Sequence, residues 1–182
     1  MRMFVALPVP EGTREELNFL CCGLPGARWV PSDNFHITLR FLGEIDGGTA
    51  EDVDAALVGI RAPAFDVEIA DVGCFANGRN VRSIWAGVKP SAALAHLHDK
   101  VKSAVVRAGL TPDGKKFTPH VTLTRSKVSL GDARAWLVRN SLYRAIPFAA
   151  THFTLFRSFI GGEGAFYRAE SEYDLEAAVD VA

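Results

Sequence analysis

The sequence predicts an α+β fold in which two related lobes face each other across a cleft. Predicted strands and helices alternate twice along the chain in a similar order. The tetrad His36-Ile37-Thr38-Leu39 lies in the first half, and a matching tetrad, His120-Val121-Thr122-Leu123, lies in the second. The 182 residues, 48% of them hydrophobic, suffice for a single domain over 1–182 that is built of two small lobes with an ample core.

The first half begins with an apolar strand and then alternates helix and strand. Pro8 ends the first strand, Gly23 follows the first helix, and Gly43 follows the second strand. Thr49 is a good N-cap, and Asn77-Gly78 predicts a hairpin turn. The expected elements are a strand over Arg2–Leu7, a helix over Glu11–Cys22, a strand over Phe35–Leu42, a helix from Thr49 to about Ile60, and a hairpin of Phe65–Phe75 with Val81–Val88.

The second half repeats this order with its own capping signals. Ser91 is the expected N-cap of a helix that Gly109 closes. The run Gly161–Gly164 predicts the turn of a final hairpin. The expected elements are a helix from Ser91 to about Ala108, a strand over His120–Thr124, a helix over Leu130–Asn140, a hairpin of Pro147–Phe159 with Ala165–Leu175, and a frayed tail over Glu176–Ala182.

Composition and charge limit the kind of ligand. A formal net charge of −1 does not attract long nucleic acid by charge alone, so a small substrate or one end of an RNA fits better. The apolar Met1–Pro10 segment lacks the regions of a signal peptide, and no run approaches the ~18 apolar residues of a membrane span. Cys21, Cys22 and Cys74 lack framework or CxxC spacing, which indicates reduced thiols in the cytoplasm and no zinc site.

Each tetrad places a histidine and a threonine on one face of its strand, because side chains two residues apart point the same way. One alternative is an amphipathic strand whose polar face meets water. The recurrence of the tetrad in both halves favours a shared pocket instead. The expected faces are His36, Thr38 and Arg40 opposite Ile37, Leu39 and Phe41 on the first strand, and His120, Thr122 and Thr124 opposite Val121 and Leu123 on the second.

Two imidazoles and two hydroxyls around one pocket suit proton transfer at a phosphate. Histidine has an ordinary pKa of ~6.5, so both of its protonation states are accessible near neutrality. Opening a cyclic phosphodiester needs a deprotonated water on one side and a protonated leaving oxygen on the other, and a histidine pair supplies both. Threonine hydroxyls donate to the non-bridging oxygens, where negative charge develops.

Other candidates have strong alternatives. Arg125 directly follows the second tetrad, but alternation turns it away from His120 unless the strand ends there. His152-Phe153-Thr154-Leu155 also fits the tetrad, yet it lies on a late apolar strand without a counterpart, so we expect His152 to face outward. Two further histidines, His96 and His98, are two apart on a predicted helix and are expected to lie on its surface without chelating a metal together.

At the two tetrads the chain resembles the 2H phosphoesterase superfamily, and within it the LigT-like RNA 2′,3′-cyclic phosphodiesterases. The matching segments are RMFVALPVP, RWVPSDNFHITLRFLGEI, KKFTPHVTLTRS and LFRSFIGGEGAFYRAESEYDL. The resemblance implies an antiparallel sheet in each lobe, with helices on its outer face and the active-site cleft between the lobes. It extends over nearly the whole chain, from Arg2 to Leu175.

The resemblance implies a metal-independent hydrolase without cofactors that opens 2′,3′-cyclic phosphates to 2′-phosphates and in some relatives rejoins 2′-5′ RNA ends. It makes His36 and His120 the catalytic pair, with His120 activating water and His36 protonating O3′, or the reverse. Thr38, Thr122 and Arg125 then bind the substrate. The expected partners are RNA ends or nucleotides that carry a cyclic phosphate, with no membrane and a monomeric state.

Two other functions remain open from the sequence. One is a related phosphoesterase that acts on another cyclic phosphate or on a 2′-5′ linkage, and the other is a non-catalytic module that binds RNA ends. The basic residues Arg79, Arg82, Lys115 and Lys116 either guide an RNA or are simply solvated.

Overall fold

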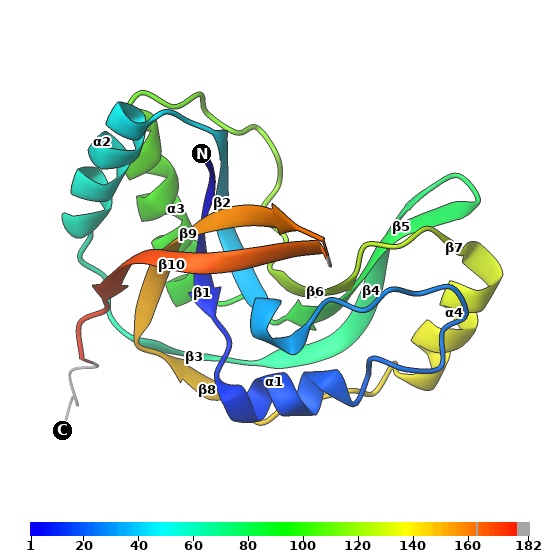
Figure 1. Cartoon of the computed structure of the whole chain (residues 1–182). Helices are drawn as coiled ribbons and strands as arrows, with labels where there is room; N and C mark the ends of the chain where they lie inside the picture. The colour runs from blue at the N-terminus through cyan, green and yellow to red at the C-terminus, as the bar shows by residue number, and fades with distance from the viewer. Residues whose placement is uncertain (163, 178–182) are drawn as a thin grey trace, which may run out of the picture.

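In the part of the chain that the structure describes, the main sheet contains eight strands, and every pairing within it is antiparallel. The computed structural model describes residues 1–162 and 164–177 (Figure 1). The sheet has the order β10-β9-β1-β2-β6-β5-β4, with β7 also paired to β5. Its strands are β1 (Arg2–Pro8), β2 (His36–Glu44), β4 (Ile69–Asn77), β5 (Asn80–Val88), β6 (His120–Thr124), β7 (Val128–Ser129), β9 (His152–Gly161) and β10 (Gly164–Asp174).

Helices cover the two ends of this sheet and divide it into the two predicted lobes. The helices are α1 (Glu11–Asn18), α2 (Gly47–Val58), α3 (Ala92–Arg107) and α4 (Leu130–Arg139). In Figure 1, α2 and α3 lie at one end, beside β1, β2, β9 and β10, and α4 lies at the other, beside β4, β5 and β7. The predicted α+β fold with two lobes is therefore confirmed. Within the described residues, the main-sheet strands of the two lobes meet where β2 pairs with β6, through Ile37 and Val121.

The lobes do not correspond to the two halves of the sequence, contrary to the expected repeat. The helix α3 belongs to the second half, yet it packs against α2 and β2. The C-terminal hairpin of β9 and β10 also joins the first lobe, by pairing with β1. The reason is burial: Phe153 and Leu155 of β9 and Leu97 and Val101 of α3 complete the apolar core around β1.

Capping explains where the helices begin and end. Asp46, not Thr49, is the N-cap of α2, because its carboxylate accepts from the Thr49 amide at 2.8 Å. The predicted cap Ser91 of α3 is confirmed, since its hydroxyl accepts from the Leu94 amide at 3.1 Å. The first helix ends at Asn18, short of the predicted Cys22, and Gly23 follows with a φ of +69°.

Two predicted strands are each split by the fold. The segment Phe65–Phe75 divides at Glu68 into β3 (Phe65–Val67) and β4, and Pro147–Phe159 divides at Thr151 into β8 (Phe148–Ala150) and β9. The two short pieces, β3 and β8, pair with each other in a separate two-stranded sheet. The Asn77-Gly78 hairpin turn is confirmed, with a φ of +62° at Gly78.

The predicted fraying from Glu176 is wrong at that residue, and residues 178–182 of the predicted tail lie outside the described part. The Glu176 amide donates to the Ala62 carbonyl at 2.9 Å, and its carbonyl accepts from the Ala64 amide at 2.7 Å. Among the described residues, no helix is long and apolar enough to cross a membrane.

Glycine at position 73 lets the indole of Trp85 lie against the backbone of β4. The two residues are paired across β4 and β5, and a Cβ at position 73 would overlap the Trp85 ring. We expect Gly73→Ala to lower the free energy of unfolding by about 1–3 kcal/mol, because overpacking displaces the ring.

Urea unfolding measures the effect of Gly73→Ala, and Gly12→Ala in α1 is its matched control. Gly12 has no atom within 4 Å of an added Cβ, so this change should be neutral or stabilising. Equal stability of the Gly73→Ala variant and the wild type would contradict the packing argument.

Candidate active site

The pairing of β2 with β6 brings the two tetrads together. Ile37 is the register partner of Val121, and each follows its histidine directly. Extending the antiparallel register by one residue sets His36 opposite Thr122, and Thr38 opposite His120. The four side chains predicted from sequence therefore belong to neighbouring positions on one face of two adjacent strands.

The first histidine, His36, is held by a carbonyl and enclosed by aromatic rings. Its Nδ1 lies 2.7 Å from the Asn34 carbonyl oxygen, and only 9% of the residue is exposed. Its ring centroid lies 4.7 Å from that of Phe4 and 5.2 Å from that of Tyr167. Burial lowers the pKa of His36 to about 4, against the opposing effect of the Asn34 hydrogen bond and with a further lowering by the charge of Arg125.

The second histidine repeats this arrangement in a more open position. The Nδ1 of His120 lies 2.6 Å from the Thr118 carbonyl oxygen, again two residues earlier. The rings of Phe75 and Trp85 lie 5.2 and 5.7 Å from its ring. Burial also lowers the pKa of His120, opposed by the Thr118 hydrogen bond and assisted by the charge of Arg125.

The carbonyl partners determine the tautomer of both neutral imidazoles. A carbonyl oxygen only accepts, so Nδ1 must carry the proton in each ring. The lone pair then lies on Nε2, at the opposite end of the ring from the carbonyl. Each histidine thus keeps one ring nitrogen free to accept a proton, with its ring orientation set by the backbone.

The strand that carries the second tetrad ends directly before Arg125. This is the condition under which Arg125 is expected not to turn away from His120. β6 stops at Thr124, whose hydroxyl donates to the Arg28 carbonyl at 2.6 Å. Arg125 then turns toward the first lobe, and its Nη1 donates to the Tyr167 hydroxyl at 3.2 Å. Sequence reasoning missed Tyr167, which lies on β10 and touches both Arg125 and His36; only the hairpin pairing brings it here.

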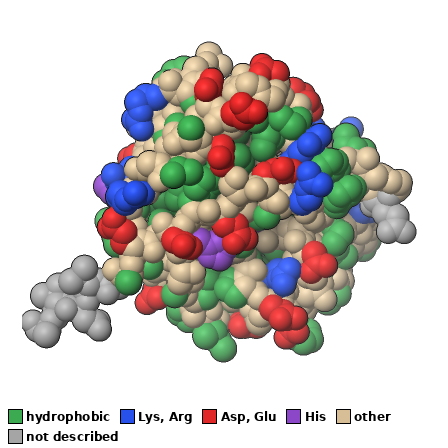
Figure 2. Space-filling model, turned by 60° about the vertical axis from the view of Figure 1, so that its left-hand side comes forward, with side chains coloured by type: hydrophobic (Ala, Val, Ile, Leu, Met, Phe, Trp, Pro, Cys, Tyr) green, Lys and Arg blue, Asp and Glu red, His purple; other side chains and the backbone are tan. Residues whose placement is uncertain are grey.

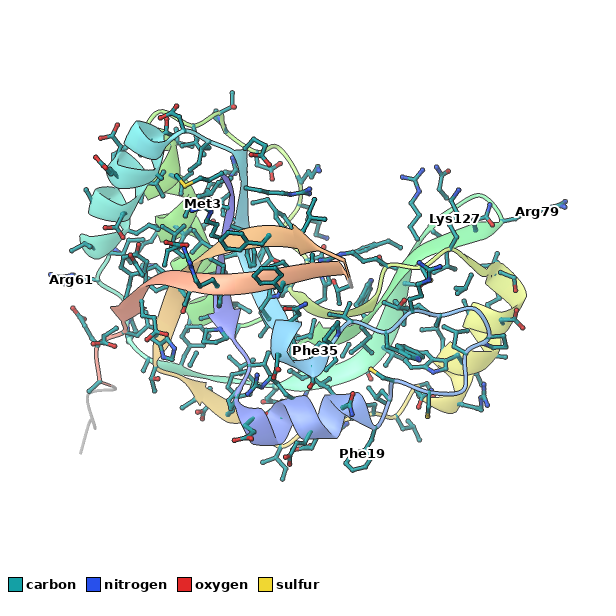
Figure 3. The ribbon with its side chains drawn as sticks, in the orientation of Figure 1. Met3, Phe19, Phe35, Arg61, Arg79 and Lys127 are labelled. Carbon is teal, nitrogen blue, oxygen red and sulfur yellow. The ribbon has the colours of Figure 1, made fainter. Side chains whose placement is uncertain are left out.

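Three pockets adjoin these residues. The first, of about 600 Å³, is lined by residues of both lobes, among them Arg28, Trp29, Asn34, Arg125, Lys127 and Tyr167. The second, of about 380 Å³, is lined by a set that includes Thr38, Phe41, Phe75, Phe117 and His120. The third, of about 200 Å³, is lined by a set that includes Asn34, His36, Phe156 and Tyr167. Figure 3 shows Phe35, which directly precedes His36, near the end of β2 that faces α1. Separate pockets therefore lie beside Arg125, beside Thr38 and His120, and beside His36.

Register shifts change two of the predicted strand faces. The pairing of β2 with β1 skips Leu39 and Leu42, so Phe41 leaves the apolar face on which it was predicted and is 58% exposed at the second pocket. A similar register shift at Leu123 turns the Thr124 side chain away from the site, and Thr124 is fully buried. The expected grouping of Thr124 with His120 and Thr122 is therefore wrong.

The remaining polar candidates have structural contacts. Arg40 is 8% exposed, and its Nη1 lies 2.9 Å from an Asp113 carboxylate oxygen. His96 is exposed as predicted, whereas His98 is only partly exposed, lines the second pocket, and stacks on Phe117 with ring centroids 3.9 Å apart. Within the described ranges, no group of three or more His, Cys, Asp or Glu side chains is arranged to hold a metal ion.

The third tetrad lies level with the first, but two strands away from it. Thr154 is opposite Ala6 of β1, which is in turn opposite Thr38 of β2. His152 begins β9, where it is half-buried and its Nδ1 lies 3.2 Å from the Thr151 hydroxyl. β1 therefore separates this tetrad from β2, whereas the second tetrad lies beside it.

The sequence model of the family described as LigT like Phosphoesterase matches residues 7–85 and 87–167. The chain belongs to this family. It is 27% identical over 185 residues to an RNA 2′,3′-cyclic phosphodiesterase of Thermotoga maritima, with 98% of each chain covered. It is 31% identical over 128 residues to the Escherichia coli K12 protein of that name, covering 68% of this chain and 71% of the relative.

Other LigT-like relatives match over part of their length, and solved structures share the whole fold. The chain spans 60% of an Aeropyrum pernix relative and 49% of a Geobacillus stearothermophilus one, each named RNA 2′,3′-cyclic phosphodiesterase. The E. coli LigT structure in apo form is 26% identical with a TM-score of 0.80, covering 96% of this chain and 97% of that chain. E. coli LigT complexed with 3′-AMP, also 26% identical over the same shares, has a TM-score of 0.81. The predicted family is confirmed.

The low pKa of His36 makes stability depend on pH. The unfolded chain binds a proton at this side chain near pH ~6.5, whereas the folded chain binds it only near pH 4. The stabilisation linked to His36 is thus fully present above about pH 6.5 and is lost as the pH falls toward 4.

Urea unfolding at pH 7, 6 and 5 tests this dependence. Replacing His36 by Asn should make the loss of unfolding free energy toward low pH shallower, by up to about 1 kcal/mol per pH unit. Identical pH slopes for the wild type and His36→Asn would show that His36 is not desolvated in the folded state.

Proposed function

We propose that this chain hydrolyses 2′,3′-cyclic phosphates, at RNA ends or on nucleotides, to 2′-phosphates with His36 and His120 as the catalytic pair. The observation that carries the proposal is the equivalent anchoring of the two imidazoles on adjacent strands, each by the carbonyl two residues earlier. The names of the relatives support this substrate, and so does the E. coli LigT complex with 3′-AMP.

The reaction needs one base and one acid. One imidazole accepts a proton from water at Nε2 as the water oxygen attacks phosphorus. The bond from phosphorus to O3′ breaks. The other imidazole, which starts protonated, gives its proton to O3′, and the phosphate remains on O2′. The protonation states of the two histidines are then exchanged, and proton exchange with solvent restores them.

One physical argument bears on which histidine is the acid and which is the base. The sequence hypothesis makes His120 the base and His36 the acid. The deeper burial of His36 favours its neutral form, which suits the reverse assignment. A phosphodiester with a good leaving group needs no acid, so it should restore activity only to the variant that lacks the acid histidine.

Neighbouring groups stabilise the charge that develops on the phosphate. We propose that the Thr38 and Thr122 hydroxyls, both half-buried, donate to the non-bridging oxygens. Arg125 supplies a positive charge to the same phosphate, and the Tyr167 hydroxyl helps to orient its guanidinium. The exposed rings of Phe41 and Phe75 in the pocket beside His120 offer stacking surfaces for the nucleobase.

The chemistry as proposed uses no metal or cofactor, because the two imidazoles move the protons and Arg125 offsets the charge. Reverse ligation of a 5′-hydroxyl RNA is the second candidate. It is favoured by the pocket of about 600 Å³ beside Arg125, which would place that RNA next to the phosphate. A different cyclic phosphate, a 2′-5′ linkage, or RNA-end binding without turnover are the alternatives that a substrate panel separates.

We further propose that the chain works as a cytoplasmic monomer and as a single domain. Residues of both lobes of one chain line the pocket beside Arg125, so neither lobe forms it alone. The three cysteines are free, which agrees with a reducing compartment.

Removing either histidine tests the proposed chemistry. In EDTA, the wild type should convert a 2′,3′-cyclic phosphate RNA to a 2′-phosphate product. His36→Ala and His120→Ala should each lower kcat by about 10²–10⁴-fold, because each removes one proton-transfer group.

The third tetrad supplies the matched control for the histidine variants. His152→Ala should keep wild-type turnover, since β1 separates its strand from β2. Undiminished turnover in both His36→Ala and His120→Ala would sink the proposal. A 3′-phosphate product would show that the other phosphorus–oxygen bond breaks.

Removing the threonine hydroxyls tests their contact with the phosphate. Thr38→Val and Thr122→Val should each lower kcat by roughly 10²–10³-fold, in line with loss of one donor to a developing oxyanion. Thr38→Ser and Thr122→Ser keep the hydroxyl and should recover most of the rate. If valine and serine behave alike, the hydroxyls do not contact the reacting phosphate.

A further inference from the structure

The pocket beside Thr38 and His120 concentrates positive charge. Its lining includes Arg40 and three lysines, Lys102, Lys115 and Lys116, but only one carboxylate, that of Asp113. Arg40 already pairs with this carboxylate at 2.9 Å. Within the described part of the chain, none of the three lysines forms an ion pair. Three lysines without an ion-pair partner among the described residues therefore line one pocket of a chain whose net charge is −1.

These lysines come from two separate elements that the fold brings together. Lys102 lies on α3, whereas Lys115 and Lys116 lie on the loop between α3 and β6. Buried Arg40 of β2 holds that loop, because its Nη2 donates to the Thr111 carbonyl at 2.6 Å and its Nη1 pairs with Asp113. The Asp113 carboxylate also accepts from the Lys115 amide at 3.0 Å. The strand that carries His36 and Thr38 thus positions the lysine loop, with Arg40 as a positioning residue.

The structure separates Lys115 and Lys116 from the other two basic candidates of the sequence. Arg79 lies at the turn between β4 and β5, and Figure 3 shows it at the far end of the second lobe. Arg82 is exposed on β5, and neither arginine lines the lysine pocket. Figure 2 shows acidic and basic side chains interspersed over one face of the molecule. The fold therefore brings Lys115 and Lys116, but neither arginine, to this pocket.

We propose that Lys102, Lys115 and Lys116 bind the phosphate on the 5′ side of the terminal nucleotide, while the cyclic phosphate lies at the two histidines. This inference rests on the proposed function. Ammonium groups bind phosphate as point charges. The aromatic rings in the same pocket provide a stacking surface for the nucleobase of the nucleotide that carries both phosphates. The chain therefore prefers RNA ends and 5′-phosphorylated nucleotides over a nucleoside 2′,3′-cyclic phosphate.

Three substrates that differ only at the 5′ position test the subsite. They are adenosine 2′,3′-cyclic phosphate, the same compound with a 5′-phosphate, and a dinucleotide that ends in the cyclic phosphate. Lys115→Ala/Lys116→Ala should lower kcat/KM for the two 5′-phosphate substrates about tenfold more than for the nucleoside. Lys102→Ala should act in the same direction. For the dinucleotide, the double variant should also make the dependence of log kcat/KM on log salt shallower by about 0.7.

Arg79→Ala/Arg82→Ala is the matched control, because it removes the same charge from outside the pocket. It should leave the preference for a 5′-phosphate unchanged. The proposal is overturned if the wild type shows no such preference, or if the lysine variant loses activity equally on all three substrates.

Binding distinguishes failure of this inference from failure of the proposed function. Should the wild type turn over none of the three substrates, the proposed function fails. Calorimetry with adenosine 2′,5′-bisphosphate and adenosine 2′-monophosphate then tests the subsite by itself. Tighter binding of the bisphosphate that is lost in Lys115→Ala/Lys116→Ala supports the lysine site, and equal binding of the two ligands rejects it.

Discussion

The geometry of the candidate site depends on the contact between β2 and β6. These strands join the two lobes through one pair of fully buried residues, Ile37 and Val121. An antiparallel pair of strands has local two-fold symmetry. Because the paired residues Ile37 and Val121 each directly follow a histidine, the two histidines occupy equivalent positions on their strands. A slip of one residue would point the imidazoles away from the hydroxyls of the facing strand. The apolar pair thus determines the placement of the polar residues beside it.

Burial differs between the two histidines because, among the described residues, more aromatic rings enclose His36 than His120. The β9–β10 hairpin supplies Tyr167 and Phe156, which lie against the His36 ring together with Phe4. His120 contacts only Phe75 and Trp85 among aromatic rings of the described residues, and it is the more accessible of the two. Two chemically identical side chains with the same backbone anchor therefore differ in the cost of carrying a charge. Distinct acid and base roles require two groups whose environments change their pKa values to different extents.

Local signals predicted the local structure well, and their errors have identifiable causes. The strand over His120–Thr124 and the Ser91 cap were both right, because alternation and capping act over a few residues. Asp46 was missed as a cap since Asp46 and Thr49 are both good capping residues, and only the path of the backbone decides between them. Phe41 was placed on the wrong face because strict alternation does not foresee bulges, which arise from pairing with β1. Tyr167 gave no local signal at all.

The sequence by itself determined the α+β class, the family resemblance, and the candidate residues His36, Thr38, His120, Thr122 and Arg125. These follow from spacing and residue type, which are properties of the chain alone. Only the tertiary structure decided which tetrads meet, because strand pairing joins residues about 84 positions apart and leaves the third tetrad beyond β1. It likewise gathered lysines from α3 and from the loop before β6 into one pocket. Long-range pairing and burial depend on the whole core, so no short window of sequence contains them.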